Sequence, residues 1–124
     1  MKRALVVGID DYPMHPLSGC INDAASVATL LEKNGDGSPN FSVKLLKNEV
    51  STTALHEALV ELFKSDADTV VFFFAGHGVI NLETQAGFIV TQDGKKNAWG
   101  ISLGDILSLA NKAYTYNANF LHRC

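Results

Sequence analysis

The sequence lacks several features that mark whole classes of protein. Its 124 residues include two cysteines, Cys20 and Cys124, and three prolines, and no run of basic residues is longer than two. Two distant cysteines are not the disulfide framework of a small secreted domain. With 10 basic and 13 acidic residues, the net charge of −3 argues against a surface that follows nucleic-acid phosphates. We therefore expect no nucleic-acid partner and a reducing compartment.

Long hydrophobic runs are also missing. The apolar run Ala4–Ile9 follows Lys2 and Arg3 but is only six residues long, which is too short for a signal peptide. No stretch approaches the ~20 apolar residues of a transmembrane helix. Hydrophobic residues make up 47% of the chain, an ordinary globular value, and the length fits one domain. We expect a cytoplasmic protein without membrane contact, folded as a single domain over residues 1–124.

Apolar patterning predicts an α/β fold. The continuous apolar runs Ala4–Ile9 and Thr69–Ala75 are typical of strands buried on both faces of a parallel sheet. Alternation from Phe41 to Leu45 predicts a strand with one wetter face. The other expected elements are a helix from about Asn22, helices capped by Ser51 or Thr52 and by Ser102, a hairpin strand Phe88–Thr91 closed by Asp93–Gly94, and a strand beginning at Ala118–Leu121. This order predicts a three-layer α/β sandwich with a mostly parallel central sheet and helices on both faces.

Residues that carry chemistry follow the expected parallel strands, where such folds bind ligands. Glycines flank His77 and permit a sharp turn after the strand Thr69–Ala75, and an imidazole suits proton transfer near neutral pH. Cys124 ends the last expected strand, with one helix between it and His77. The two would then end neighbouring strands, and a thiol beside an imidazole is the arrangement of nucleophilic catalysis. A histidine that merely bonds a carbonyl and a cysteine that is a small buried hydrophobe are the alternatives.

Three segments carry a resemblance to a known family. They are Val6–Asp10 (VVGID), Leu17–Ala24 (LSGCINDA) and Val71–Gly78 (VFFFAGHG). Together they resemble caspase-like cysteine peptidases of family C14, of the metacaspase and orthocaspase type. The resemblance covers only the large-subunit region, so the small-subunit part of the fold is expected to be missing. It implies a cysteine endopeptidase acting on protein or peptide substrates in regulated proteolysis, such as cell death, stress response or defence.

The resemblance also implies the roles of individual residues. His77 would be the general base and acid, and Cys124 the nucleophile that forms an acyl-enzyme. The Gly78 amide would help to hold the oxyanion. Asp23 matches an aspartate that lines an acidic S1 pocket for Arg or Lys, although alone it would be a first-turn residue favoured by the helix dipole. Cys20 is expected to be a packing residue or a bystander thiol and not a nucleophile, because the spacing places no histidine with it.

The end of the sequence departs from the family's pattern D-x-C-H-S-G. The corresponding residues are Leu121–Cys124 (LHRC), so His122 replaces the aspartate that would form a second acidic wall. Without a small subunit, the strand near Ala118–Leu121 would be an open edge, to be covered by a small-subunit segment or another chain. A second interpretation is therefore a catalytically inactive caspase homologue that serves as an interaction module, or an incomplete fragment that is itself inactive.

Metal-dependent functions have weaker support. A phosphoacceptor receiver domain could use Asp10–Asp11 for magnesium, but it needs an aspartate where Ala75–His77 stands. A zinc site from His122, Cys124, Cys20 and His77 lacks the usual C-x-x-C or H-x-x-x-H spacing. Some metacaspases are stimulated by calcium, but no calcium-loop spacing is present. We expect no metal and no cofactor.

Overall fold

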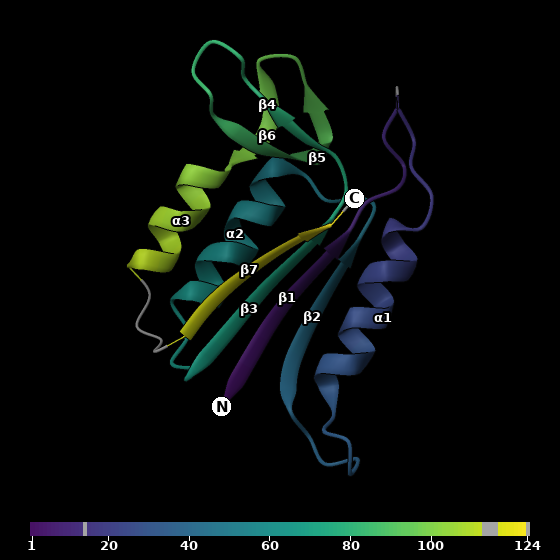
Figure 1. The fold of residues 1–124 in the computed structure, drawn as a ribbon, viewed down its shortest axis with the longest axis vertical. Helices are drawn as coiled ribbons and strands as arrows, with labels where there is room; N and C mark the ends of the chain where they lie inside the picture. Colours follow the sequence, from purple (N-terminus) through teal and green to yellow (C-terminus); the bar gives the residue numbers. More distant parts are fainter. Residues whose placement is uncertain (14, 113–116, 124) are drawn as a thin grey trace.

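A four-stranded parallel sheet forms the centre of the protein (Figure 1). The computed structural model describes residues 1–13, 15–112 and 117–123. The sheet has the order β2-β1-β3-β7, with bounds β1 Lys2–Gly8, β2 Phe41–Lys47, β3 Thr69–Ala75 and β7 Asn117–Arg123. Helix α1 (Cys20–Glu32) covers one face, and α2 (Thr52–Phe63) and α3 (Leu103–Asn111) cover the other. The predicted three-layer α/β sandwich is confirmed.

Strands β1 and β3 are buried on both faces, as their continuous apolar runs predict. Leu5 and Phe72 pack in the cluster with α2, whereas Val6 and Phe73 pack in the cluster with α1. Burial of each such side chain contributes about 1.5–3 kcal/mol to stability. This two-sided core fixes the central strands and therefore the positions of the loops that follow them.

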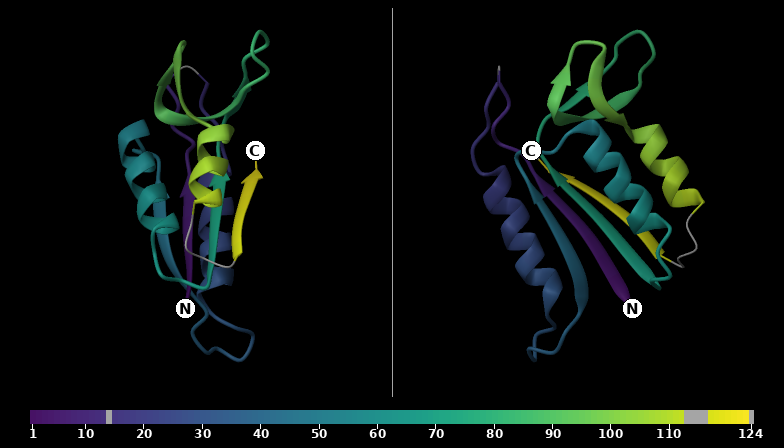
Figure 2. Two further views of the ribbon diagram at one scale, coloured as in Figure 1. Left: turned by 90° about the vertical axis from the view of Figure 1, so that its left-hand side faces the viewer. Right: turned by 180° about the vertical axis from the view of Figure 1, so that it is seen from behind.

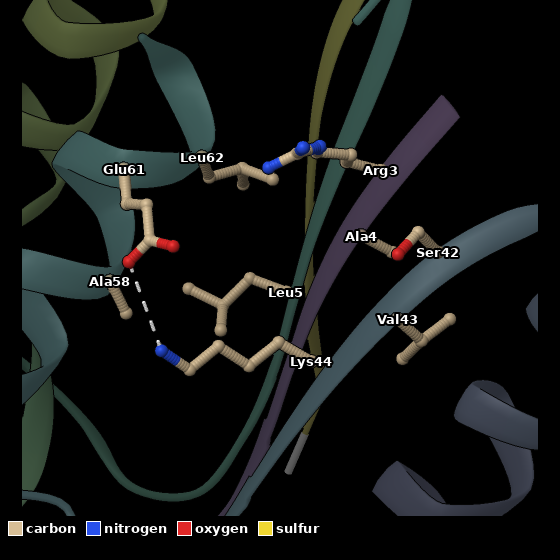
Figure 3. Close-up of a pocket in the computed structure, with 9 residues that line it drawn as sticks. All are labelled: Arg3, Ala4, Leu5, Ser42, Val43, Lys44, Ala58, Glu61 and Leu62. Atoms are coloured by element: carbon tan, nitrogen blue, oxygen red, sulfur yellow. Dashed lines mark ion pairs between the residues drawn. The ribbon is translucent and has the colours of Figure 1, made fainter. Parts of the chain in front are cut away.

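Strand β2 has the predicted wetter face. Val43 packs in the α1 cluster, while Ser42 and Lys44 are exposed on the opposite side. There they line a shallow pocket beside Glu61 of α2, and Lys44 Nζ lies 3.9 Å from Glu61 Oε2 (Figure 3). Both side chains are more than half exposed, so this ion pair contributes at most about 1 kcal/mol.

Local hydrogen bonds define where the helices begin. Ser51 Oγ accepts from the Ala54 N–H at 3.1 Å, and Ser102 Oγ accepts from the Asp105 N–H at 3.1 Å. Of the two caps expected for α2, Ser51 and Thr52, the cap is Ser51, and the predicted cap of α3 at Ser102 is confirmed. Helix α1 begins at Cys20, two residues before the expected start near Asn22.

A second, antiparallel sheet lies beyond the end of β3 (Figure 2). It has the order β4-β5-β6, with bounds β4 Gly78–Ile80, β5 Gly87–Lys95 and β6 Ala98–Ser102. The predicted closure of this hairpin at Asp93–Gly94 is wrong, because β5 continues through both residues to Lys95. The turn comes later: Lys95 pairs with Ala98, and Asn97, with a positive φ of 69°, lies between them. Gly94 instead permits the close approach of strands β5 and β6, since an added Cβ there would collide with the Trp99 carbonyl. None of the described helices is long and apolar enough to cross a membrane.

Candidate functional site

His77 lies in the short connection between β3 and β4, two residues after the end of β3, at the carboxyl end of the parallel sheet. Its backbone N–H donates to Tyr12 Oη at 3.0 Å, and the two ring centroids lie 4.5 Å apart. The preceding Gly76 is buried, and an added Cβ there would collide with Tyr12 Oη. A glycine before the histidine is thus required by this close approach.

The His77 ring is oriented by a backbone carbonyl. Its Nε2 lies 2.7 Å from the carbonyl oxygen of His15. Because a carbonyl oxygen can only accept a hydrogen bond, Nε2 must carry the proton. This tautomer leaves Nδ1 as the nitrogen that can accept a proton. The half-buried imidazole does bond a carbonyl, as one sequence interpretation held, and that bond prepares the other ring nitrogen for base chemistry.

Tyr12 joins three separate segments at the site. Its hydroxyl donates to the Val90 carbonyl at 2.8 Å while accepting from His77, and the Val90 N–H donates to the His77 carbonyl at 2.9 Å. The loop after β1, the end of β3 and strand β5 are therefore held together around His77. Sequence reasoning missed Tyr12 and His15, because neither lies in a motif and both reach His77 only through tertiary folding.

The acidic pair after β1 has a structural use. The Asp10 carboxylate accepts from the Cys20 N–H at 2.9 Å and from the Ile21 N–H at 3.2 Å, which caps the start of α1. Asn48 accepts from the backbone N–H groups of Asp10 and Asp11 and donates to the Asp11 carboxylate at 3.0 Å. Within the described part of the chain, no group of three or more His, Cys, Asp or Glu side chains is placed to hold a metal. These bonds give no support to a receiver-type phosphoacceptor site.

The proposed nucleophile, Cys124, lies outside the described residues. Strand β7 runs parallel to β3, with Arg123 opposite Ala75, so the two strands are neighbours as predicted. His77 and Arg123 therefore lie at the carboxyl ends of two adjacent parallel strands, on the same side of the sheet's end. Cys20, by contrast, is fully buried in the α1 cluster, which confirms its predicted packing role.

The two remaining predicted site residues lie on different elements. Gly78 is the exposed first residue of β4, opposite Ile89 of β5. Asp23 is half-buried in the first turn of α1, where its N–H donates to the Gly19 carbonyl at 2.9 Å. Their roles in oxyanion and substrate binding stay predictions.

A cavity of about 570 Å³ opens beside His77. Its lining comes from the loop after β1 and from the antiparallel sheet. The apolar walls are formed by Tyr12, Pro13, Val79, Val90 and Trp99, and the rest of the lining is formed by His15, His77 and residues 92–96. Asp23 is not among the described residues that line it. The cavity therefore offers a mostly apolar surface directly adjacent to the imidazole.

Comparison with known families shows which family the chain matches. The family model Peptidase_C14, described as the caspase domain, matches residues 1–115. The matched segment runs from β1 through α3 and includes His77, Gly78 and Asp23. A search of curated proteins gave no match for the chain.

Proposed function

Because the chain belongs to the caspase domain family of peptidases, we propose that it cleaves peptide bonds in protein substrates with a catalytic dyad of His77 and Cys124. The observation that carries this proposal is the orientation of the His77 ring. The His15 carbonyl accepts a hydrogen bond from Nε2–H, which leaves Nδ1 to act as the base, at the end of the sheet where β7 lies next to β3. A histidine held in a single tautomer beside a cysteine is what thiol activation requires.

The reaction begins with transfer of the Cys124 thiol proton to His77 Nδ1. The thiolate sulfur attacks the carbonyl carbon of the scissile bond, and the Gly78 amide donates to the developing oxyanion. His77 then gives its proton to the leaving amine nitrogen as the C–N bond breaks, which leaves an acyl-enzyme. Water, deprotonated by the same imidazole, attacks the thioester and releases the acid product and the Cys124 thiol.

The proposed substrate preference depends on charge. We propose that Asp23 binds an Arg or Lys side chain on the acyl side of the scissile bond, since a carboxylate pairs well with a guanidinium or ammonium group. His122 stands where a second acidic residue is expected in the family, so Asp23 supplies this preference alone.

The proposed setting of the reaction follows from the same chemistry. Because a thiolate is the nucleophile, the mechanism needs neither a metal nor another cofactor. A catalytic thiol and few cysteines suit the reducing cytoplasm, where we propose that the protein acts in regulated proteolysis.

Strand β7 is an edge strand of the described sheet. We propose that a small-subunit segment or another chain pairs with that edge and completes the substrate groove.

Cleavage of quenched peptides with Arg, Lys or Asp before the scissile bond tests this function. We expect cleavage after Arg and Lys, and loss of kcat/KM by about 10²–10⁴-fold in His77→Ala, with a comparable or larger loss in Cys124→Ala. His56→Ala is the matched control, because His56 is an exposed histidine on α2 and should leave the rate unchanged. Equal activity of wild type and His77→Ala would contradict the dyad.

A second candidate is an inactive caspase homologue that binds a partner. The observation that favours it is His122, which replaces an acidic residue of the expected substrate pocket. A folded protein that cleaves neither basic nor acidic peptides would support this candidate over the peptidase.

A further inference from the structure

The cavity beside His77 has no role in the dyad itself. We propose that it receives an apolar side chain of the substrate on the leaving-group side of the scissile bond, an assignment that rests on the proposed peptidase function. At about 570 Å³, the cavity is within the usual range for ligand pockets and can hold a side chain as large as leucine or phenylalanine.

Several uncharged polar groups that line the cavity already have protein partners, whereas the charged residues Lys95 and Lys96, which also line it, are exposed. The Tyr12 hydroxyl bonds His77 and Val90, and the His15 carbonyl accepts from the His77 ring. Gln92 Nε2 donates to the Asp11 carbonyl at 3.2 Å. Because the Tyr12, His15 and Gln92 groups are already bonded, an apolar side chain can contact them without leaving any of them unsatisfied, which allows an apolar occupant.

Trp99 supplies the largest apolar wall of this cavity. Its side chain is 37% exposed, although most large apolar side chains of the described chain are buried. Contact with a substrate side chain would remove part of this indole surface from water, and this burial is favourable for binding. Val79 and Val90 form further apolar walls of the same cavity.

The position of His77 indicates which side of the substrate enters. In the proposed mechanism the imidazole protonates the leaving amine, so the residue that begins with this amine must lie against His77. His77 is itself part of the cavity lining. Asp23 is not among the described residues that line the cavity, so the proposed binding of a basic side chain by Asp23 does not involve this cavity.

Peptides that differ only in the residue after the scissile bond test this assignment. With Arg before the bond, we expect kcat/KM at least ~10-fold higher for Leu or Phe after the bond than for Gly. Trp99→Ala should reduce this preference to near unity, and Trp99→Phe should retain it. Leu103→Ala is the matched control, because Leu103 is also 37% exposed and is not among the described residues that line the cavity. Equal cleavage of the Leu, Phe and Gly peptides, or a preference unchanged in Trp99→Ala, would overturn the assignment while leaving the peptidase function intact.

Binding can be measured without catalysis, because Trp99 is the single tryptophan of the chain. Tryptophan emission is recorded while tetrapeptides that begin with Leu, Phe or Gly are added to the full chain. A saturable change for Leu and Phe but not for Gly supports the pocket even if no peptide is cleaved, in which case only the proposed function fails. No change with any of them overturns the pocket.

Discussion

Replacement of Tyr12 by phenylalanine should destabilise the protein far more than the loss of one hydroxyl suggests. Tyr12 is 6% exposed, and its hydroxyl is bonded to the His77 N–H at 3.0 Å and to the Val90 carbonyl at 2.8 Å. Phenylalanine keeps the ring packing but leaves one donor and one acceptor without this partner. At about 1–3 kcal/mol for each of the two unsatisfied groups, we expect a loss of roughly 2–6 kcal/mol. This is a large part of the ~5–15 kcal/mol that stabilises a typical domain.

Urea unfolding followed by circular dichroism measures this loss as a change in the free energy of unfolding at constant m-value. Thr29→Val is the matched control, because Thr29 Oγ1 donates to the Ala25 carbonyl at 3.0 Å on the exposed surface of α1. The control should change stability by less than about 0.5 kcal/mol. A Tyr12→Phe loss as small as that of the control would refute the conclusion that this hydroxyl connects the site.

Three further substitutions test other parts of the fold. The pKa of Asp93 is lowered mainly because a threonine hydroxyl of its own strand donates to the carboxylate. Its stabilising contribution is present above the unfolded pKa near 3.8 and is lost as the pH falls through the lower folded pKa. Urea unfolding should therefore separate wild type from Asp93→Asn more at pH ~7 than at pH ~3, and an equal difference would contradict this linkage. Gly8→Ala places a Cβ 2.8 Å from the Ala24 Cβ, and this overpacking should destabilise the protein by about 1–3 kcal/mol. The midpoint of thermal unfolding should therefore fall in Gly8→Ala but not in the control Gly35→Ala, which has open space around the added Cβ. Ser51→Ala removes the cap of α2 and should cost about 1 kcal/mol in the same unfolding assay, and an unchanged midpoint would dispute the cap.

The parts of the fold that depend on local pattern could be predicted from the sequence. The apolar runs of β1 and β3 require burial on both faces, and this determines the layered architecture. Ser51 and Ser102 cap helices through bonds to residues only three positions away. The glycines around His77 also correctly predicted that the histidine follows the end of β3, because strand ends and tight turns are encoded in short segments.

The parts that depend on distant contacts could not be predicted in the same way. The loop after β1 folds over His77 through Tyr12 and His15, whose partners are more than sixty residues away in the sequence. The pair Asp93–Gly94 has the composition of a turn, but the Asp93 carboxylate accepts bonds from the Thr91 hydroxyl and the Thr52 N–H and stays within the strand. Tertiary hydrogen bonds overrode the local turn preference at that point.

The central place of β1 has a consequence for how the protein reaches this structure. Lys2 pairs with Phe41 of β2 and with Thr69 of β3, so the β1–β2 pairing closes a much shorter stretch of chain. Since the entropy of closing a loop grows with its length, the unit β1-α1-β2 should form before β3 joins it. His77 is then brought against Tyr12 in a late step.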